Sequence, residues 1–142
     1  MEQRLSLITL LVDDVNEARK FFVDGLGWTC AEGPETEIAF FQIGSMALAC
    51  YARSALEAEL GSPVEKGPPG NIAIAWNGRS PAEVDTACQL AVAAGARVLK
   101  APHETHWGGY SCYLEILGGH MLELAHNPFW PIAKDGSVSL SG

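Results

Sequence analysis

Glu123 is the residue whose type and position best suit acid–base or binding chemistry, since it lies between two leucines in the segment HMLELAH. Neighbouring side chains on a strand point to opposite faces, so this carboxylate points away from both leucines. In a cavity it would serve as a general base or bind a cationic group, because burial raises the pKa of a carboxyl toward neutral pH. The alternative is a structural glutamate that hydrogen-bonds to the neighbouring backbone or to Asn71.

Trp107 and Tyr110 are the aromatic candidates, and they flank a Gly-Gly dipeptide in the segment WGGYS. The two rings would stack on a planar ligand, and the glycines would let the backbone approach it closely. The alternative is that aromatic residues here pack on the protein itself. For the later segment NPFWP at 127–131 we favour that second reading, in which its rings and prolines cap the core and fix the tail.

Composition restricts the functional classes. The chain has 142 residues, 48% of them apolar, and a net charge of −8, which is typical of one globular domain. It contains no Lys/Arg cluster that would meet phosphate, so we expect neither nucleic acid nor a membrane as partner. The N-terminal segment lacks the features of a signal peptide. The four cysteines form no C-x-x-C pair. We therefore expect reduced thiols and a cytoplasmic protein.

The first half of the chain predicts strand, helix and three further strands over about residues 5–52. Residues 5–12 are an apolar strand, and Asp14 is the N-cap of the helix that follows. A short strand is predicted at 28–31. Two more strands, IAFFQI and MALACY, are joined by the two-residue turn Gly44-Ser45. A linker of about residues 53–70 follows, with a short helix at its start and a Gly/Pro-rich end.

The second half repeats this order over about residues 71–131, and a tail covers 132–142. NIAIAW predicts a strand, and Ser80-Pro81 predicts a helix start. The strand ARVLKA follows, and then YSCYLEI and HMLELAH pair across residues 117–119. Aligning the halves matches Leu7 with Asn71, and Gly44-Ser45 with Gly119-His120.

A duplicated module is the best interpretation of this repeat. One module cannot complete a core alone, so two βαβββ modules would join into one α+β domain spanning residues 1–142. Their curved mixed sheets would form a cup, with the helices outside. The alternative is an ordinary α+β sandwich whose halves are similar by accident.

Several segments resemble the vicinal-oxygen-chelate superfamily, which comprises glyoxalase, bleomycin-resistance and dioxygenase-like proteins. They are ITLLVDDVNEARKFFVDGLGW, IAFFQIG, EVDTACQLAVAAGARVLKAP, WGGYS and NPFWP, and together they span about residues 5–131. The resemblance implies this fold and a homodimer. In the enzymes of the family it implies a divalent metal in the cup, which acts as a Lewis acid.

The resemblance places metal ligands on the first and last strands of each module. Those positions fall on Leu7, Leu48, Asn71 and Glu123. Only Glu123 is a good donor, whereas a tight site needs three or more, so we expect no cofactor. The alternative is a relocated metal site built from His106, His120 and Glu123. The competing interpretation is that these histidines are ordinary loop residues that bind no metal.

The sequence therefore predicts a small-molecule-binding protein of the bleomycin-resistance type, with an apolar or aromatic ligand in the cup and a degenerate metal site. The residues expected to line the cup are Thr9, Leu11, Leu48, Asn71, Trp107, Tyr110, Met121 and Glu123. The alternative is a metal-dependent lyase, isomerase or dioxygenase in which Glu123 is catalytic. Whether the chain is an enzyme stays open at this point.

Overall fold

A computed structural model describes residues 6–31, 36–67 and 72–138. The chain divides into two compact units, residues 1–67 and residues 68–142, and the boundary falls inside the predicted linker. Each unit contains one sheet and its own helices, which is the α+β class predicted from the sequence. No helix in the described ranges is long and apolar enough to cross a membrane.

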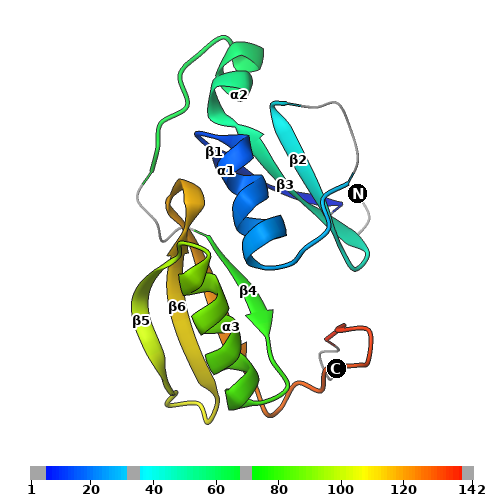
Figure 1. Cartoon of the computed structure of the whole chain (residues 1–142), viewed down its shortest axis with the longest axis vertical. Helices are drawn as coiled ribbons and strands as arrows, with labels where there is room; N and C mark the ends of the chain where they lie inside the picture. Colours follow the sequence, from blue (N-terminus) through cyan, green and yellow to red (C-terminus); the bar gives the residue numbers. More distant parts are fainter. Residues whose placement is uncertain (1–5, 32–35, 68–71, 139–142) are drawn as a thin grey trace. The chain divides into compact units, whose positions relative to one another are not determined.

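In the first unit, the described residues form three strands, two α-helices and one π-helical segment, η1 (Figure 1). Their bounds are β1 (Leu7–Val12), α1 (Val15–Arg19), η1 (Lys20–Gly25), β2 (Ile38–Ile43), β3 (Met46–Ala52) and α2 (Arg53–Leu60). The sheet order is β1-β3-β2, with β1 parallel and β2 antiparallel to the central strand. The predicted turn Gly44-Ser45 is confirmed, since it joins β2 directly to β3.

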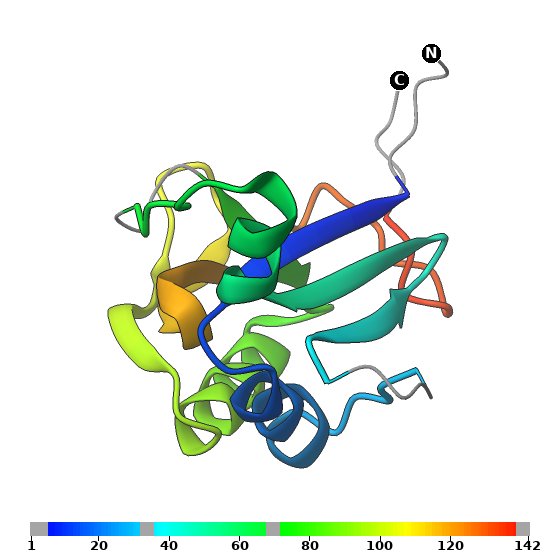
Figure 2. The ribbon, with the colours of Figure 1, turned by 90° about the horizontal axis from the view of Figure 1, so that it is seen from above.

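The first helix begins as predicted at Asp14, whose carboxylate accepts hydrogen bonds from the backbone N–H groups of Asn16 and Glu17 at 2.7 and 3.3 Å. α1 continues directly into η1, where a bond from the Leu26 N–H to the Phe21 carbonyl widens the helix (Figure 2, dark blue). The Phe22 ring is buried, and its centroid lies 5.0 Å from that of Phe41 on β2. This contact fixes which face of the sheet the helix covers.

The strand predicted at 28–31 is present only as a single bridge between Cys30 and Phe41. The Trp28 N–H donates to the Phe22 carbonyl at 2.8 Å, and the Trp28 ring packs against the Phe22 ring. The backbone at the start of this segment therefore caps the helix and is not available to a neighbouring strand.

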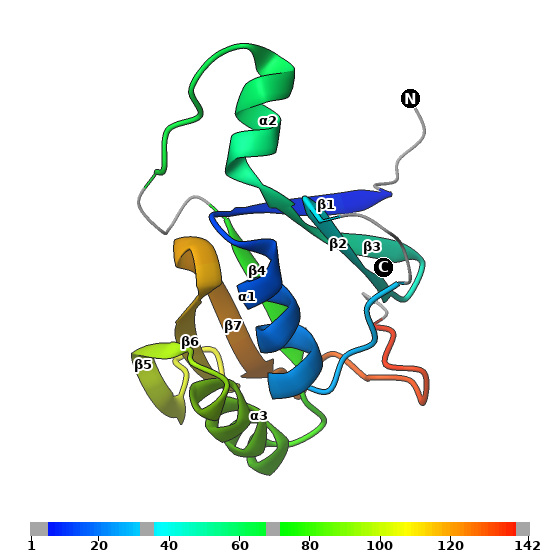
Figure 3. The same ribbon diagram turned by 45° about the horizontal axis from the view of Figure 1, so that its top comes forward.

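Residues 72–138, the described part of the second unit, form four strands and one long helix. Their bounds are β4 (Ala73–Asn77), α3 (Pro81–Ala93), β5 (Arg97–Glu104), β6 (Tyr110–Ile116), the short 3₁₀ turn η2 (Leu117–Gly119) and β7 (His120–His126). The sheet order is β4-β7-β6-β5, and α3 lies across one face of it (Figure 3). The predicted cap is confirmed, because the Ser80 hydroxyl accepts from the Glu83 N–H at 3.2 Å.

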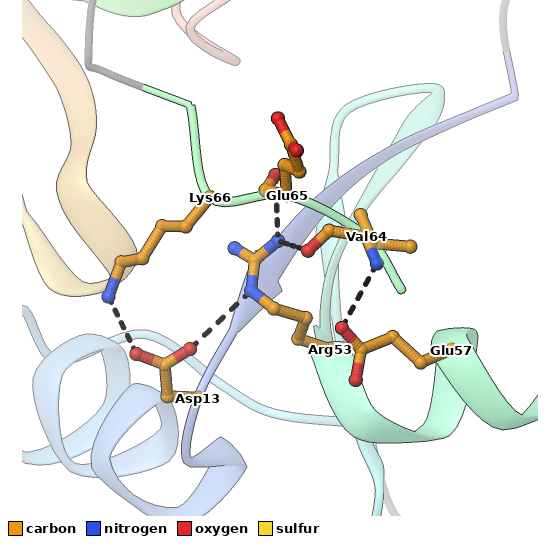
Figure 4. Close-up of polar contacts among 6 residues, drawn as sticks. All are labelled: Asp13, Arg53, Glu57, Val64, Glu65 and Lys66. Atoms are coloured by element: carbon orange, nitrogen blue, oxygen red, sulfur yellow. Dashed lines mark hydrogen bonds and ion pairs between the residues drawn. The ribbon is translucent and has the colours of Figure 1, made fainter. Parts of the chain in front are cut away.

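An ion-pair cluster links the end of the first unit to Asp13, the residue that follows β1 (Figure 4). The Asp13 carboxylate lies 3.5 Å from Arg53 Nε and 2.7 Å from Lys66 Nζ. The Arg53 guanidinium also donates to the Val64 carbonyl at 3.4 Å, and the Val64 N–H donates to Glu57 at 3.0 Å. These contacts hold the segment that follows α2 against the body of the unit.

The stability of this cluster should depend on pH. The hydrogen bond and charge of Lys66, assisted by Arg53, lower the pKa of Asp13 below its ordinary value of 3.8. Because the carboxyl is more acidic in the folded state, its contribution is complete above pH 3.8 and is lost as the pH falls through the lower, folded pKa. We expect Asp13→Asn to remove part of the acid dependence of unfolding and to speed amide exchange over 61–67.

Urea unfolding at a series of acidic pH values, with amide exchange at neutral pH, would measure both effects. Asp24→Asn is the matched control, since Asp24 is exposed and belongs to none of the ion pairs formed within the described ranges. Equal behaviour of the two variants would contradict the role given to the cluster.

Candidate functional site

The face of the second sheet opposite α3 carries a carboxylate among small side chains. Strand pairing places Glu123 on β7 beside Ala75 on β4 and Tyr113 on β6. The flanking positions of the same face carry Ala73 and Asn77 on β4, and Met121 and Ala125 on β7. Alanine side chains leave volume above a sheet that larger side chains would fill. The side chains of β4 and β7 around Glu123 are mostly small and apolar.

Tyr113 and Glu123 form the polar centre of this face. The Tyr113 hydroxyl donates a hydrogen bond of 2.9 Å to Glu123 Oε1, and both side chains are half-buried. The hydrogen bond to the carboxylate, together with desolvation, raises the pKa of Tyr113 above its ordinary value of 10.0. The phenol therefore keeps its proton at neutral pH and holds the carboxylate in one orientation.

The first unit has the same geometry with apolar residues in place of this pair. There Ala49 on β3 lies between Thr9 on β1 and Phe40 on β2, as Glu123 lies between Ala75 and Tyr113. Phe40 thus replaces the tyrosine, and Ala49 replaces the glutamate. The equivalent positions of the first unit therefore carry no such polar pair.

This register corrects the position assigned to Leu48. Leu48 pairs with Phe41, the residue that contacts the helix, and it is 2% exposed. Its side chain therefore lies in the core under the helix, on the face opposite Thr9. The match of Gly44-Ser45 with Gly119-His120 is wrong by one residue, because His120 is the first residue of β7 and the turn before it covers residues 117–119. One residue of difference moves every side chain to the other face.

Tyr110 also lies on the helix side of its sheet, which corrects its placement in the cup lining. Its hydroxyl donates to the Asp85 carboxylate of α3 at 2.8 Å, and that bond, with desolvation, raises the pKa of Tyr110. Trp107 folds back over the Gly109 backbone, so that a Cβ on this glycine would overlap the indole ring. The glycine accommodates a tryptophan of the same chain, whereas the sequence suggested a ligand.

The remaining predicted positions divide as follows. Thr9 and Leu11 alternate with Leu10 on β1 and lie on the face that carries Ala49. Met121 lies on the face that carries Glu123. Asn71 lies outside the described residues. Of the candidate residues, the structure therefore brings together Met121 and Glu123 in one unit, and Thr9 and Leu11 in the other.

The relocated metal site does not form. His120 pairs with Ile116 on the face toward α3, so strand alternation turns it away from Glu123. His106 is exposed in the loop between β5 and β6. Over the described ranges, no three His, Cys, Asp or Glu residues form a group that could hold a metal ion. The family's metal does not fit the residues described here, since Glu123 offers one donor and Leu7 and Ala49 offer none.

Tyr113 is a site residue that the sequence analysis did not place in the cup lining, although the signal was present. The predicted pairing across residues 117–119 places Ile116 opposite His120. Counting three residues outward along each strand then sets Tyr113 opposite Glu123. The position follows from the length of the turn alone.

The buried thiols are poor nucleophiles. Burial raises the pKa of the Cys50 thiol to about 12 and likewise raises that of Cys112, which lies beside Cys88 of α3. A thiol with such a pKa is almost wholly protonated at neutral pH, and the thiolate is the reactive form. This agrees with the expectation of reduced, structural cysteines.

Comparisons with known proteins give one family. Residues 4–124 match the family described as Glyoxalase/Bleomycin resistance protein/Dioxygenase superfamily. A glyoxalase-related enzyme from Fulvimarina pelagi is 33% identical, with a TM-score of 0.90 over 99% of this chain and 100% of that one. No curated protein matches.

Two further solved structures share the fold at lower identity. A glyoxalase/bleomycin resistance protein/dioxygenase from Nocardioides is 21% identical, with a TM-score of 0.74 over 89% of this chain and 84% of that one. A lactoylglutathione lyase from Agrobacterium tumefaciens is 22% identical, with a TM-score of 0.68 over 92% of this chain and 98% of that one.

Gly109→Ala should destabilise the protein. Its Cβ would meet the Trp107 ring and lie 2.7 Å from the backbone oxygen of His126, so indole and strand must both shift. We expect a loss of about 1–3 kcal/mol in the free energy of unfolding, measured with urea. Gly67→Ala is the control, because a Cβ there meets nothing within 4 Å. Equal stability of the two variants would show that Trp107 moves aside freely.

Glu123→Gln should lower the pKa of Tyr113. An amide carries no charge to oppose ionisation of the phenol, and it can donate a hydrogen bond to the phenolate. Ultraviolet difference titration of the protein should show one tyrosine ionising at lower pH in the variant. The same titration of the Tyr113→Phe protein identifies which signal belongs to this residue. An unchanged titration curve in Glu123→Gln would contradict the hydrogen-bonded pair.

Proposed function

We propose that this chain, which belongs to the Glyoxalase/Bleomycin resistance protein/Dioxygenase superfamily, is a small-molecule-binding protein that holds an apolar or aromatic ligand without a metal. The proposed contact surface is the sheet face that carries Glu123 in the second unit.

One observation supports this proposal above the others: a hydrogen-bonded Tyr113–Glu123 pair stands among alanines on a sheet face that carries no helix of its own unit. Binding sites for small molecules combine mainly apolar walls with a few placed polar groups that fix orientation. Here the alanines and Met121 would contact the body of the ligand, and the polar pair would orient it.

The residues at the equivalent positions of the first unit also argue against a role of Glu123 as a metal ligand. Chelation of a substrate needs several protein donors around one ion. In the first unit the equivalent position is Ala49, and the neighbouring first-strand residues Leu7 and Thr9 add no carboxylate or imidazole. We therefore assign Glu123 to ligand contact, with the metal site degenerate.

Ala75→Phe tests where the ligand binds. Ala75 is exposed and lies next to Glu123 on the neighbouring strand, so a phenyl group there should occupy the ligand volume. We expect the neutral fluorescent dye N-phenylnaphthylamine to bind the original protein and to lose at least about tenfold in affinity in the variant, equivalent to about 1.4 kcal/mol. Fluorescence titration measures the affinity, and circular dichroism checks the fold.

Gln89→Phe is the matched control, since it adds the same ring at an exposed position of α3. Equal dye affinity in Ala75→Phe and the original protein would contradict the proposed location. A purified protein that carried one tightly held Ni, Zn, Fe or Mn ion per chain would contradict the metal-free form of the proposal.

A further inference from the structure

The Tyr113–Glu123 pair presents only hydrogen-bond acceptors to a ligand. The single hydroxyl hydrogen of Tyr113 is donated to Glu123 Oε1, so the phenol oxygen has only lone pairs left to offer. An ionised carboxylate accepts hydrogen bonds and donates none. A ligand group that meets this pair must therefore bring its own donors.

The negative charge of Glu123 is not compensated by the surrounding strands. It takes part in none of the ion pairs formed within the described ranges. The residues of β4 on this face are Ala73, Ala75 and Asn77, and none of them carries a charge. On β6, the neighbouring carboxylate of Glu115 is already paired with Arg97 of β5, at 2.7 Å.

Lys100 is the cation that strand pairing aligns with this row, and it lies beyond Tyr113. It pairs with Tyr113 on β5, the edge strand, so it is two strands away from Glu123. Its own side chain is exposed. A half-buried carboxylate that is oriented by a neutral phenol and has no cation on an adjacent strand favours a positively charged partner from outside.

We infer that the ligand carries a protonated amine, or a similar cationic N–H group, on an apolar or aromatic body, and that the site rejects carboxylates and phosphates. This rests on the proposed function, and it adds the chemical class of the ligand. An anion here would meet lone pairs and a negative charge, with no donor from either member of the pair. A cationic N–H group would form a charge-assisted hydrogen bond with Glu123.

Three probes of similar size separate the contribution of charge to affinity from that of apolar contact. Benzylamine is a cation, benzyl alcohol is neutral and benzoate is an anion, and all three carry one phenyl ring. Ligand-detected NMR on the full chain at neutral pH would measure each affinity. We expect benzylamine to bind at least about tenfold more tightly than benzyl alcohol, and benzoate not to bind. In Glu123→Gln, which has nearly the same shape, benzylamine should fall to the affinity of benzyl alcohol.

Glu59→Gln is the control, because Glu59 also accepts a tyrosine hydroxyl, that of Tyr51 at 3.3 Å, but in the first unit on α2. This variant should bind benzylamine as the original protein does. An equal loss in both variants would show a general effect of surface charge and overturn the inference.

The other outcomes separate the two proposals. If benzyl alcohol binds and benzylamine binds no more tightly, or if benzoate binds best, the ligand class is wrong while small-molecule binding stands. If none of the three probes binds at millimolar concentration, and the neutral dye also fails to bind, both proposals are overturned.

Discussion

The lengths of two tight turns decide which side chains share a sheet face in this protein. Gly44-Ser45 joins β2 to β3 with two residues, and the turn from β6 to β7 has three. Because side chains on a strand alternate, these lengths set Phe40 across from Ala49 in one unit and Tyr113 across from Glu123 in the other. The chemistry assigned to the second unit depends on this pairing.

Much of the fold could be predicted from local sequence signals. Asp14 and Ser80 cap helices as predicted, because a short polar side chain before an apolar stripe satisfies the first free backbone N–H groups. The segment at Trp28 could not be foreseen in the same way. Its backbone caps the preceding helix, and that bond depends on where the Phe22 and Trp28 rings pack. Packing of this kind involves three-dimensional contacts that no spacing rule contains.

The candidate site was only partly accessible from the sequence. Glu123 could be placed because two flanking leucines fix its direction. Leu48 was assigned to the wrong face because the two halves were matched one residue out of register. Tyr110 was assigned to the wrong face because no sequence signal indicates its hydrogen bond to Asp85 of α3. Trp107 could not be placed, since only the structure shows its ring lying over Gly109.

A single sheet position can serve quite different chemistry according to its neighbours. Surrounded by several other donors, a carboxylate at the end of a module chelates an ion. Here Glu123 has a phenol on one side and alanines on the other, so it is suited to recognition through hydrogen bonds. This local donor set favours binding over metal chemistry, whereas the fold by itself favours neither.

The repetition of one module with different residues at equivalent positions has a consequence for how ligand preference could change over evolution. Phe40 and Ala49 stand where Tyr113 and Glu123 stand in the other copy. Equivalent positions thus carry apolar side chains in the first copy and a polar pair in the second, so substitutions in one copy can change the residues of this sheet face while the other copy keeps its own. A duplicated chain can in this way diversify one copy and keep the other.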